Sequence, residues 1–435
     1  MLFLYMTPSL YHWFQQTLHV LHPQSLLHRA LQVKDNILFI QGVSKKTTID
    51  LSQFKKILLI GYGKASVPMA CEVDVILKGR ITKGLVVTKE NTKKVPAYIE
   101  VLYAQHPTPD HSSIEAGRRM LSFAKEADEQ TLVVNVVSGG GSSLLESITF
   151  PLQDLLSLTE DLLKSGADIR AVNTVRRHLS LIKGGGLAQA LWPARSISLI
   201  ISDVLGDRVE DIASGPTAYD PHPVRESIDV LTQYVPHLQE KIRVHLKKKK
   251  IPDAVFDQTE HIILANTYTV AQQLHASAQE AKIPTFTMSS RISGESRFIG
   301  AWYAMMAEGI LLDHFPAPAP LCVIGSGEST VTVKGTGKGG RNQELALAFI
   351  AYILATSLDF SRVYFLSAGT DGRDGYTDAA GVYLTPKIFR RACRMPVDKY
   401  LSNNDSYNFF LKTGGLLFTG ATGTNVCDVQ ILLVL

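Results

Sequence analysis

Five glycine-rich turns follow short apolar runs of this sequence, and most of them carry a charged residue. They span residues 61–65 (Gly-Tyr-Gly-Lys-Ala), 138–143 (Ser-Gly-Gly-Gly-Ser-Ser), 335–341 (Gly-Thr-Gly-Lys-Gly-Gly-Arg), 369–375 (Gly-Thr-Asp-Gly-Arg-Asp-Gly) and 420–425 (Gly-Ala-Thr-Gly-Thr-Asn). Glycine lets a backbone approach a phosphate group closely, and a helix N-terminus presents free N–H groups to an anion. The turns therefore predict an enzyme that handles a phosphorylated ligand.

Lys64 is the cation of the first turn, between an expected strand at residues 56–60 and an expected helix. A helix dipole disfavours a cation at the helix N-terminus, so a nearby anion would offset the cost. We therefore interpret Lys64 as a ligand contact, with Gly61 and Gly63 beside it. An ordinary surface lysine is the alternative.

The second turn follows an expected buried strand at residues 131–137 and contains three consecutive glycines. Such a run costs chain entropy, and a nest of backbone N–H groups for a phosphate or carboxylate would explain it. A loose turn is the alternative. The residues assigned to this nest are Ser138, Gly139, Gly140, Gly141 and Ser142.

Residues 335–340 match the G-x-G-x-x-G fingerprint of dinucleotide binding. The fingerprint also requires an acidic residue about 20 positions later, at the end of the next strand. Asp359 lies before the expected strand at residues 363–366, and the first carboxylate after it is Asp371, so a nicotinamide cofactor loses support. The sequence contains neither a Walker A motif nor the protein-kinase motifs. The candidates for anion contact here are Gly339, Gly340 and Arg341.

Carboxylates follow two of the apolar strands. Asp203 ends the run at residues 196–202, and Asp371 follows the strand at residues 363–366. Carboxylates at strand ends can hold Mg²⁺ together with substrate phosphates, or act as a general base for a hydroxyl. We take both aspartates as candidate metal ligands, although Asp is also an ordinary turn residue.

Three further residues receive weaker assignments. His106, beside two prolines, is a candidate substrate contact. His178 is favoured as a structural residue. Lys183 stands directly before three glycines, which is typical of a helix C-cap.

The elements that position these residues alternate between strand and helix in the first half of the chain. This alternation indicates α/β architecture with a doubly wound, mostly parallel sheet. Prolines and polar residues between about 220 and 260 indicate a boundary, so we expect an N-terminal Rossmann-like domain over residues 1–255 and a C-terminal α/β domain over residues 256–435. A hairpin-like segment at residues 321–333 predicts a mixed sheet in the second domain.

The bulk properties of the chain are those of a globular protein. Its 435 residues are more than a single hydrophobic core ordinarily contains, so we expect more than one domain. Its net charge of +4 does not require a polyanionic partner. Four cysteines without a C-x-x-C pair indicate reduced thiols. Lys247–Lys250 is interpreted as a solvated run and Met1–Met6 as a weak leader candidate. We expect a cytoplasmic protein without nucleic-acid or membrane partners, and a homodimer is one candidate assembly.

Together, these segments make the chain resemble the glycerate 2-kinase family with a MOFRL-type C-terminal domain, whose members often carry the name hydroxypyruvate reductase. The resemblance runs from about residue 10 to the end. The order and spacing of the segments make it specific. They are residues 61–65, 106–110, 137–145, 175–180, 183–185, 202–207, 212–217, 339–347, 369–375, 404–407 and 419–425.

The resemblance implies two α/β domains with the active site in the cleft between them. It also implies ATP and Mg²⁺, and phosphorylation of D-glycerate at the 2-hydroxyl to give 2-phosphoglycerate. Lys64 and Arg341 match the cations expected to neutralise phosphate charge, and Asp203 and Glu328 match acidic cleft positions. Asn425, in the last matching segment, is a further candidate cofactor contact.

Three departures from the family pattern leave substrate preference open. Ser326 and Ala421 replace a usual glycine and proline, and Gly186 replaces a common polar residue. Two other functions remain as alternatives. One is an NAD(P)H-dependent hydroxypyruvate reductase, and the other is a non-catalytic regulator that binds a nucleotide or sugar phosphate.

Overall fold

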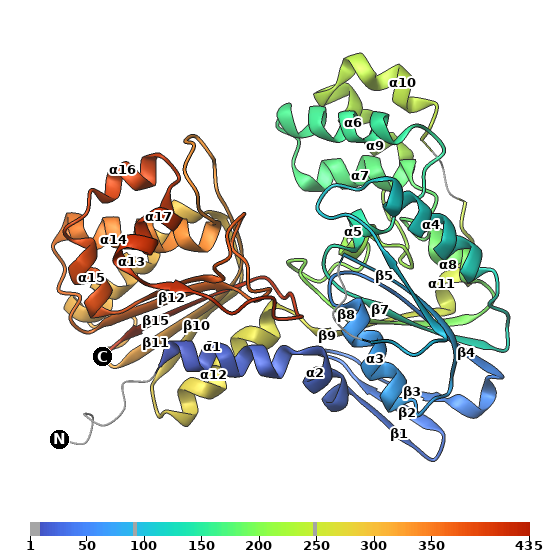
Figure 1. The fold of residues 1–435 in the computed structure, drawn as a ribbon, viewed down its shortest axis with the longest axis horizontal. Helices are drawn as coiled ribbons and strands as arrows, with labels where there is room; N and C mark the ends of the chain where they lie inside the picture. Colours follow the sequence, from blue (N-terminus) through green and yellow to red (C-terminus); the bar gives the residue numbers. More distant parts are fainter. Residues whose placement is uncertain (1–8, 90–93, 247–249) are drawn as a thin grey trace. The chain divides into compact units, whose positions relative to one another are not determined.

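The computed structural model describes residues 9–89, 94–246 and 250–435. The leader candidate Met1–Met6 and most of the Lys247–Lys250 run lie outside the described residues. The chain forms two compact units, one made of Pro23–Leu264 and the other of Met1–His22 together with Ala265–Leu435 (Figure 1). No helix of the described residues is both long and apolar enough to cross a membrane.

This division differs from the expected domains in two ways. The boundary falls at Leu264 and not at residue 255, and helix α1 (Leu10–Leu21) belongs to the C-terminal unit. The physical reason is that α1 packs its buried face against α12 (Thr267–Glu280) and strand β12 (Val363–Gly369), more than 240 residues further along the chain.

A six-stranded sheet forms the centre of the Pro23–Leu264 unit, with the strand order β6-β5-β4-β7-β8-β9. The first five of these strands pair in parallel, as the alternation of strand and helix predicts. The chain runs from β4 outward to β6, then returns to the other side of β4 and runs outward from β7 to β9. The strands are β4 (Lys56–Tyr62), β5 (Ile81–Thr88), β6 (Ile99–Tyr103), β7 (Thr131–Val137), β8 (Arg195–Ile201) and β9 (Thr259–Ala265).

Helices cover both faces of this sheet. Helix α3 packs on β4 and β5, whereas α4 and α8 contribute to the buried apolar cluster on the other face. A further group of helices, α6, α7, α9 and α10, has its own apolar core (Figure 1). The helices are α2 (Pro23–Ala30), α3 (Ser66–Ile76), α4 (His111–Ala124), α5 (Gly141–Leu144), α6 (Leu152–Lys164), α7 (Ile169–Leu179), α8 (Gly186–Leu191), α9 (Val224–Tyr234), α10 (Gln239–Arg243) and α11 (Asp253–Asp257).

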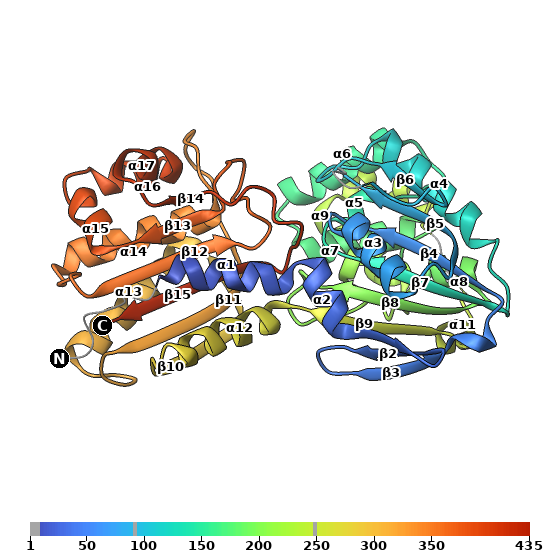
Figure 2. The same cartoon turned by 60° about the horizontal axis from the view of Figure 1, so that its bottom comes forward.

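A small antiparallel sheet completes this unit. Its strands are β1 (Leu31–Lys34), β2 (Ile37–Gln41) and β3 (Lys46–Asp50), each paired with the next along the chain. Figure 2 shows it beside β9.

The second unit contains a mixed sheet with the strand order β10-β11-β15-β12-β13-β14, which confirms the expected mixed character. Strands β10 and β11 are parallel, and the remaining neighbours are antiparallel. Helices α13 and α14 cover one face with an apolar cluster. The remaining elements are β10 (Thr285–Glu295), β11 (Leu321–Thr330), β13 (Gly381–Leu384), β14 (Leu416–Leu417), β15 (Asp428–Val434), α13 (Ser296–Leu312), α14 (Arg341–Thr356), α15 (Pro386–Ala392), α16 (Val397–Ser402) and α17 (Ser406–Thr413).

The expected hairpin at residues 321–333 is wrong, because Leu321–Thr330 is one continuous strand, β11. The glycines that suggested a turn allow close packing within the sheet instead. A Cβ on Gly327 would lie 2.1 Å from the carbonyl oxygen of Ile292 in β10. The sheet is mixed because the last strand, β15, inserts antiparallel between β11 and β12.

Candidate functional site

The carboxyl ends of β4 and β7 form the topological switch point of the first sheet. These two strands are neighbours, but the chain leaves them toward opposite edges of the sheet. Ligands of open α/β sheets bind at such a point because the loops diverge there and leave a crevice. The structure therefore brings together two of the predicted turns, the one with Lys64 and the one that begins at Ser138.

Glycines at the end of β4 allow the two turns to touch. A Cβ on Gly61 would lie 2.5 Å from Val136 Cγ2, and one on Gly63 would lie 2.3 Å from Ser138 Oγ. Gly63 also has φ +127°, a conformation that other residues rarely adopt. The backbone N–H of Lys64 donates to Gly139 O at 3.0 Å, and the N–H of Ala65 donates to Ser138 Oγ at 2.9 Å.

The loop of residues 138–142 presents unused backbone donors. Among the described residues, the N–H groups of Gly139, Gly140 and Gly141 donate no hydrogen bond to the protein. Gly140 has φ +87°, and a Cβ there would lie 2.9 Å from the ring of His106 and 3.4 Å from Lys64 Cγ. A cation and an imidazole thus flank a concave run of donors, which is the arrangement of an anion nest.

The serines of this loop have structural partners. Ser142 Oγ lies 2.7 Å from Ser214 Oγ, and Ser143 Oγ donates to Pro107 O at 2.5 Å. Ser214 and the preceding Ala213 both have positive φ, of 63° and 51°. Strained backbone of this kind persists only where the surrounding structure holds it, and it is concentrated at functional sites.

Buried charges lie directly beneath this loop. Lys183 Nζ, which has no solvent exposure, donates to Leu145 O at 2.7 Å and to Glu146 Oε2 at 2.8 Å. Arg176 donates to Ser142 O at 3.2 Å and pairs with the same carboxylate at 3.4 Å. Burial lowers the pKa of Lys183 to about 8, although Glu146 opposes this shift. Despite its burial, Glu146 has a lowered pKa because Lys183 and Arg176 stabilise its charge.

Sequence reasoning missed this network. The glycines after Lys183 suggested a C-cap, but the lysine lies beyond the end of α7 at Leu179 and its side chain supports the loop. His178 is structural, as expected, because Nδ1 lies 2.8 Å from Ser227 Oγ and Nε2 lies 3.1 Å from His222 O. The only signal for this network in the sequence was the pair of adjacent basic residues Arg176 and Arg177, on a helix with an apolar face.

Asp203 lies two residues beyond the end of β8, at the same edge of the sheet as Lys64 and the 138–142 loop. It is half-buried. Ser202 Oγ accepts the N–H of Val204 at 3.3 Å, which shapes the turn that carries the carboxylate. In the described part of the chain, no group of three or more His, Cys, Asp or Glu side chains is arranged to hold a metal ion.

A second group of predicted residues meets around Arg341, the first residue of α14. Its guanidinium makes two bonds to Asp428, Nε to Oδ2 at 2.5 Å and Nη2 to Oδ1 at 2.9 Å, and a third to Glu328 Oε1 at 2.5 Å. Asp428 is fully buried at the start of β15. Burial disfavours the charge of Arg341, but Asp428 and Glu328 outweigh it and raise the pKa of the guanidinium. Sequence reasoning missed Asp428, which no glycine turn marked.

Gly339 and Gly340 have a packing role at the start of α14. A Cβ on Gly340 would lie 2.3 Å from Asp374 Cγ. The carboxylate of Asp374 accepts the N–H groups of Asn342 at 3.0 Å and Gln343 at 2.8 Å. These two donors at the N-terminus of α14 are therefore occupied by a side chain of the protein. Burial and the charge of Asp428 raise the pKa of Asp374 to about 6.

Asp371 lies two residues after β12, in the turn that follows Gly369. A Cβ on Gly369 would lie 3.4 Å from Asp371 Oδ1 and 3.3 Å from Asp428 Oδ1. Asp371 Oδ1 also accepts the N–H of Arg373 at 3.0 Å. Mg²⁺ is commonly held by one or two carboxylates and several waters. The carboxylate of Asp371 is a donor of this kind, whereas both oxygens of Asp428 bond Arg341. Asn425 is half-buried in the loop before β15.

Family models match most of the chain. Residues 9–247 match a family described as "Domain of unknown function (DUF4147)", and residues 321–428 match the MOFRL family. The D-glycerate 2-kinase of Thermotoga maritima is 37% identical over 422 residues, which cover 95% of this chain and 99% of that protein. The glycerate 2-kinase of Pyrococcus horikoshii is 35% identical, and the match covers 95% of this chain and 93% of that protein.

A solved structure agrees with these relatives. The crystal structure of glycerate kinase from Thermotoga maritima matches with a TM-score of 0.81 and 32% sequence identity, over 98% of each chain. The likeness therefore includes both units of the chain.

Proposed function

Because the chain belongs to the family of glycerate 2-kinases with a MOFRL domain, we propose that it transfers the γ-phosphoryl group of ATP to the 2-hydroxyl of D-glycerate, giving 2-phosphoglycerate. The observation that carries the proposal is the switch point of the first sheet, where Lys64 lies beside three glycine N–H groups that donate no hydrogen bond within the described part of the chain. A polyanionic ligand suits this site, because it can accept several N–H bonds and neutralise the lysine.

Phosphoryl transfer requires little covalent chemistry from a protein. It requires the reacting groups to be held in line and the charge on the transferring group to be neutralised. In our proposal the 138–142 loop holds a phosphate or the substrate carboxylate by its backbone donors, and Lys64 neutralises the transferring group. Arg341 supplies a second positive charge, which Asp428 and Glu328 hold in a fixed orientation.

The proposal includes Mg²⁺ with Asp371 and Asp203 as its candidate ligands. Mg²⁺ bound there would neutralise charge on the phosphate oxygens. One of these aspartates would also orient the acceptor hydroxyl.

The direct test incubates the purified protein with Mg²⁺, ATP and D-glycerate and determines the position of the phosphate by ³¹P NMR. A 2-phosphoglycerate signal is expected. Formation of the 3-phospho isomer would support kinase activity but would refute transfer to the 2-hydroxyl. Absence of any phosphorylated product would refute the proposal.

The role of Lys64 is tested by Lys64→Ala. We expect turnover to fall about 100-fold or more, because the transition state loses several kcal/mol of charge stabilisation. Arg341→Ala should have a similar effect. Lys125→Ala, an exposed lysine at the end of α4, is the matched control and should leave turnover unchanged. Near-normal turnover in Lys64→Ala and Arg341→Ala would remove both residues from the mechanism.

The nicotinamide alternative has little support in the first unit. In a dinucleotide-binding sheet, an acidic residue at the end of the second strand binds the ribose. The corresponding strand here, β5, ends at Thr88, and Lys89 follows it. An assay of NADH oxidation with hydroxypyruvate tests this alternative directly, and we expect no oxidation.

A further inference from the structure

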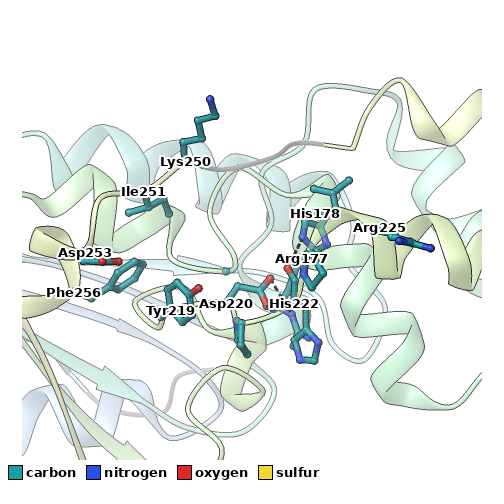
Figure 3. A pocket seen from close by; sticks show the side chains of 14 residues that line it. Arg177, His178, Tyr219, Asp220, His222, Arg225, Lys250, Ile251, Asp253 and Phe256 are labelled. Atoms are coloured by element: carbon teal, nitrogen blue, oxygen red, sulfur yellow. Dashed lines mark hydrogen bonds and ion pairs between the residues drawn. The ribbon is translucent and has the colours of Figure 1, made fainter.

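The proposed function leaves two surface features of the chain unexplained. One is a cavity of about 520 Å³ in the Pro23–Leu264 unit. Its lining divides between the rings of Tyr219 and Phe256, which contact each other, and the ion pair of Arg177 with Asp220 (Figure 3). Such a mixed lining indicates no single class of ligand. The other feature is an apolar surface with a regular spacing, on helix α13 of the second unit.

The solvent-facing side of α13 carries an apolar stripe. Four of its large side chains have exposed fractions between 40 and 77%, namely Phe298, Trp302, Met305 and Leu312. The opposite side of the helix is buried in the apolar cluster that α13 shares with α14 (Figure 1). A surface helix of a globular protein normally has one apolar side, and a helix that is apolar on all sides is normally covered on all sides. The stripe therefore indicates a partner that covers it.

The two charged residues of α13 do not belong to the stripe. Arg297 Nε donates to Glu344 at 2.6 Å, and Arg297 Nη2 donates to Leu401 O at 2.6 Å. Glu308 accepts the hydroxyl of Tyr352 at 2.8 Å. Both charges are thus bound within the same unit. The stripe itself contains no lysine or arginine, which a membrane-surface helix uses to bind anionic lipid.

The spacing of the stripe is that of a seam between two helices. Its residues at positions 298, 302, 305, 309 and 312 follow one another after four, three, four and three positions. Apolar residues at this alternating spacing form the line along which one helix packs against another. Phe315 folds back onto the helix at the glycine of this series, because its N–H donates to Gly309 O at 3.1 Å. Phe315 is 70% exposed and extends the stripe beyond Leu312.

The exposed area of the stripe suits the centre of a stable protein interface. A large aromatic side chain offers about 150–250 Å² of surface, so with these exposed fractions the stripe presents roughly 500 Å². Monomeric proteins rarely expose a contiguous apolar patch of more than a few hundred Å². A stable interface buries about 800 Å² on each partner, with an apolar centre and a polar rim. The stripe is large enough to supply that centre.

We propose that the stripe is the interface of a homodimer, in which α13 packs antiparallel on α13 of a second copy of the chain. A two-fold axis at Met305 places this residue against its own copy and places Phe298 against Leu312. Trp302 then meets the end of the stripe that carries Phe315. A two-fold interface must be complementary to itself, and each large side chain of the stripe meets another apolar side chain in this arrangement. The inference does not depend on the proposed function, because no residue of the stripe belongs to the candidate site.

The first test measures the molar mass of the full chain in solution by sedimentation velocity. The wild type should sediment as a dimer at micromolar concentration. Leu312→Glu should raise the Kd of the dimer about 100-fold or more, because each dimer would bury two carboxylates in an apolar interface. Leu411→Glu is the matched control, since it places the same charge at an exposed leucine of α17 in the same unit, and it should leave the dimer intact.

The second test reports on the antiparallel arrangement by cross-linking. It uses a Cys393→Ser background, which removes the exposed cysteine. Met305→Cys should form a disulfide-linked dimer under oxidation, because the two-fold axis brings the two copies of residue 305 together. Phe298→Cys should not, because its two copies lie at opposite ends of the helix pair, about 20 Å apart along the axis at about 1.5 Å per residue.

Each of the following results would overturn the inference. A wild type that stays monomeric at micromolar concentration does so, and if that monomer binds phosphatidylcholine vesicles the stripe is a lipid contact. A dimer that Leu312→Glu weakens no more than Leu411→Glu does must form through another surface. Cross-linking in Phe298→Cys but not in Met305→Cys would refute the antiparallel arrangement. Because these side chains are exposed in the single chain, the variants should fold, and thermal unfolding of each variant checks this.

Discussion

The bond between Arg341 and Asp428 leads to a prediction about stability that must be tested before any loss of turnover is assigned to catalysis. Asp428 is fully buried, and Arg341 holds it by two hydrogen bonds of 2.5 and 2.9 Å. Removing one partner of a buried ion pair costs about 3–5 kcal/mol, because the other charge is left uncompensated. Since the side chain of Arg341 is 33% exposed, we expect the lower end, about 3 kcal/mol, for Arg341→Gln and for Asp428→Asn.

The double variant should cost less than the sum of the two single variants. With both charges removed, neither side chain is buried and unpaired, so a coupling energy of about 2 kcal/mol is expected. Glu328 also bonds the guanidinium of Arg341. In Asp428→Asn the arginine remains and still pairs with Glu328, whereas Arg341→Gln removes the partner of both carboxylates. Arg341→Gln should therefore be the more costly single substitution.

The assay can report on one unit alone. The chain has three tryptophans, and in a Trp192→Phe background the remaining two, Trp13 and Trp302, both belong to the unit that contains Arg341. Urea unfolding followed by tryptophan fluorescence then gives the free energy of unfolding of that unit. This design avoids the failure of two-state analysis in a protein with two units.

Two results would refute the reasoning. Additive effects of the two substitutions, within about 0.5 kcal/mol, would mean that the pair does not interact. Single variants that cost no more than the control Arg394→Gln, at an exposed arginine, would mean that the pair is not effectively buried. Exposed substitutions of this kind change stability by about 0.5 kcal/mol or less.

Three further predictions follow from the same contacts. Gly63→Ala should lower the midpoint of thermal unfolding, because the new Cβ would lie 2.3 Å from Ser138 Oγ, and an unchanged midpoint would contradict the close approach. Lys183→Met should cost about 3–5 kcal/mol by leaving Glu146 buried without its lysine, and adding Glu146→Gln should recover part of the loss in urea unfolding. Asp374, with its pKa raised to about 6, binds a proton more tightly in the folded state than in the unfolded state. Its contribution to stability should therefore fall by about 2 kcal/mol as pH rises from about 4 to about 6, and the difference between wild type and Asp374→Asn, measured by urea unfolding at each pH, should show this slope.

The local features of the fold and of the first site follow from the sequence, because they depend on neighbouring residues. Apolar runs at residues 56–60 and 131–137 form strands, and the glycines after them form the turns that hold Lys64 and the 138–142 loop. Parallel pairing of two such strands then places both turns at one edge of the sheet. The sequence was therefore sufficient to indicate that these two turns lie close together, and the order of the motifs was sufficient to indicate the family.

Only the tertiary structure decided which charges meet beneath and beside these turns. Asp428 reaches Arg341 because the last strand inserts antiparallel between β11 and β12, and the two residues are 87 positions apart. Lys183 reaches Glu146 across 37 positions, and α1 joins the unit formed by the end of the chain. No local pattern marks such partners, because a buried ion pair is selected by the packing of distant elements around it. The sequence by itself determined the turns and the strands, and the packing determined the electrostatic network that holds them.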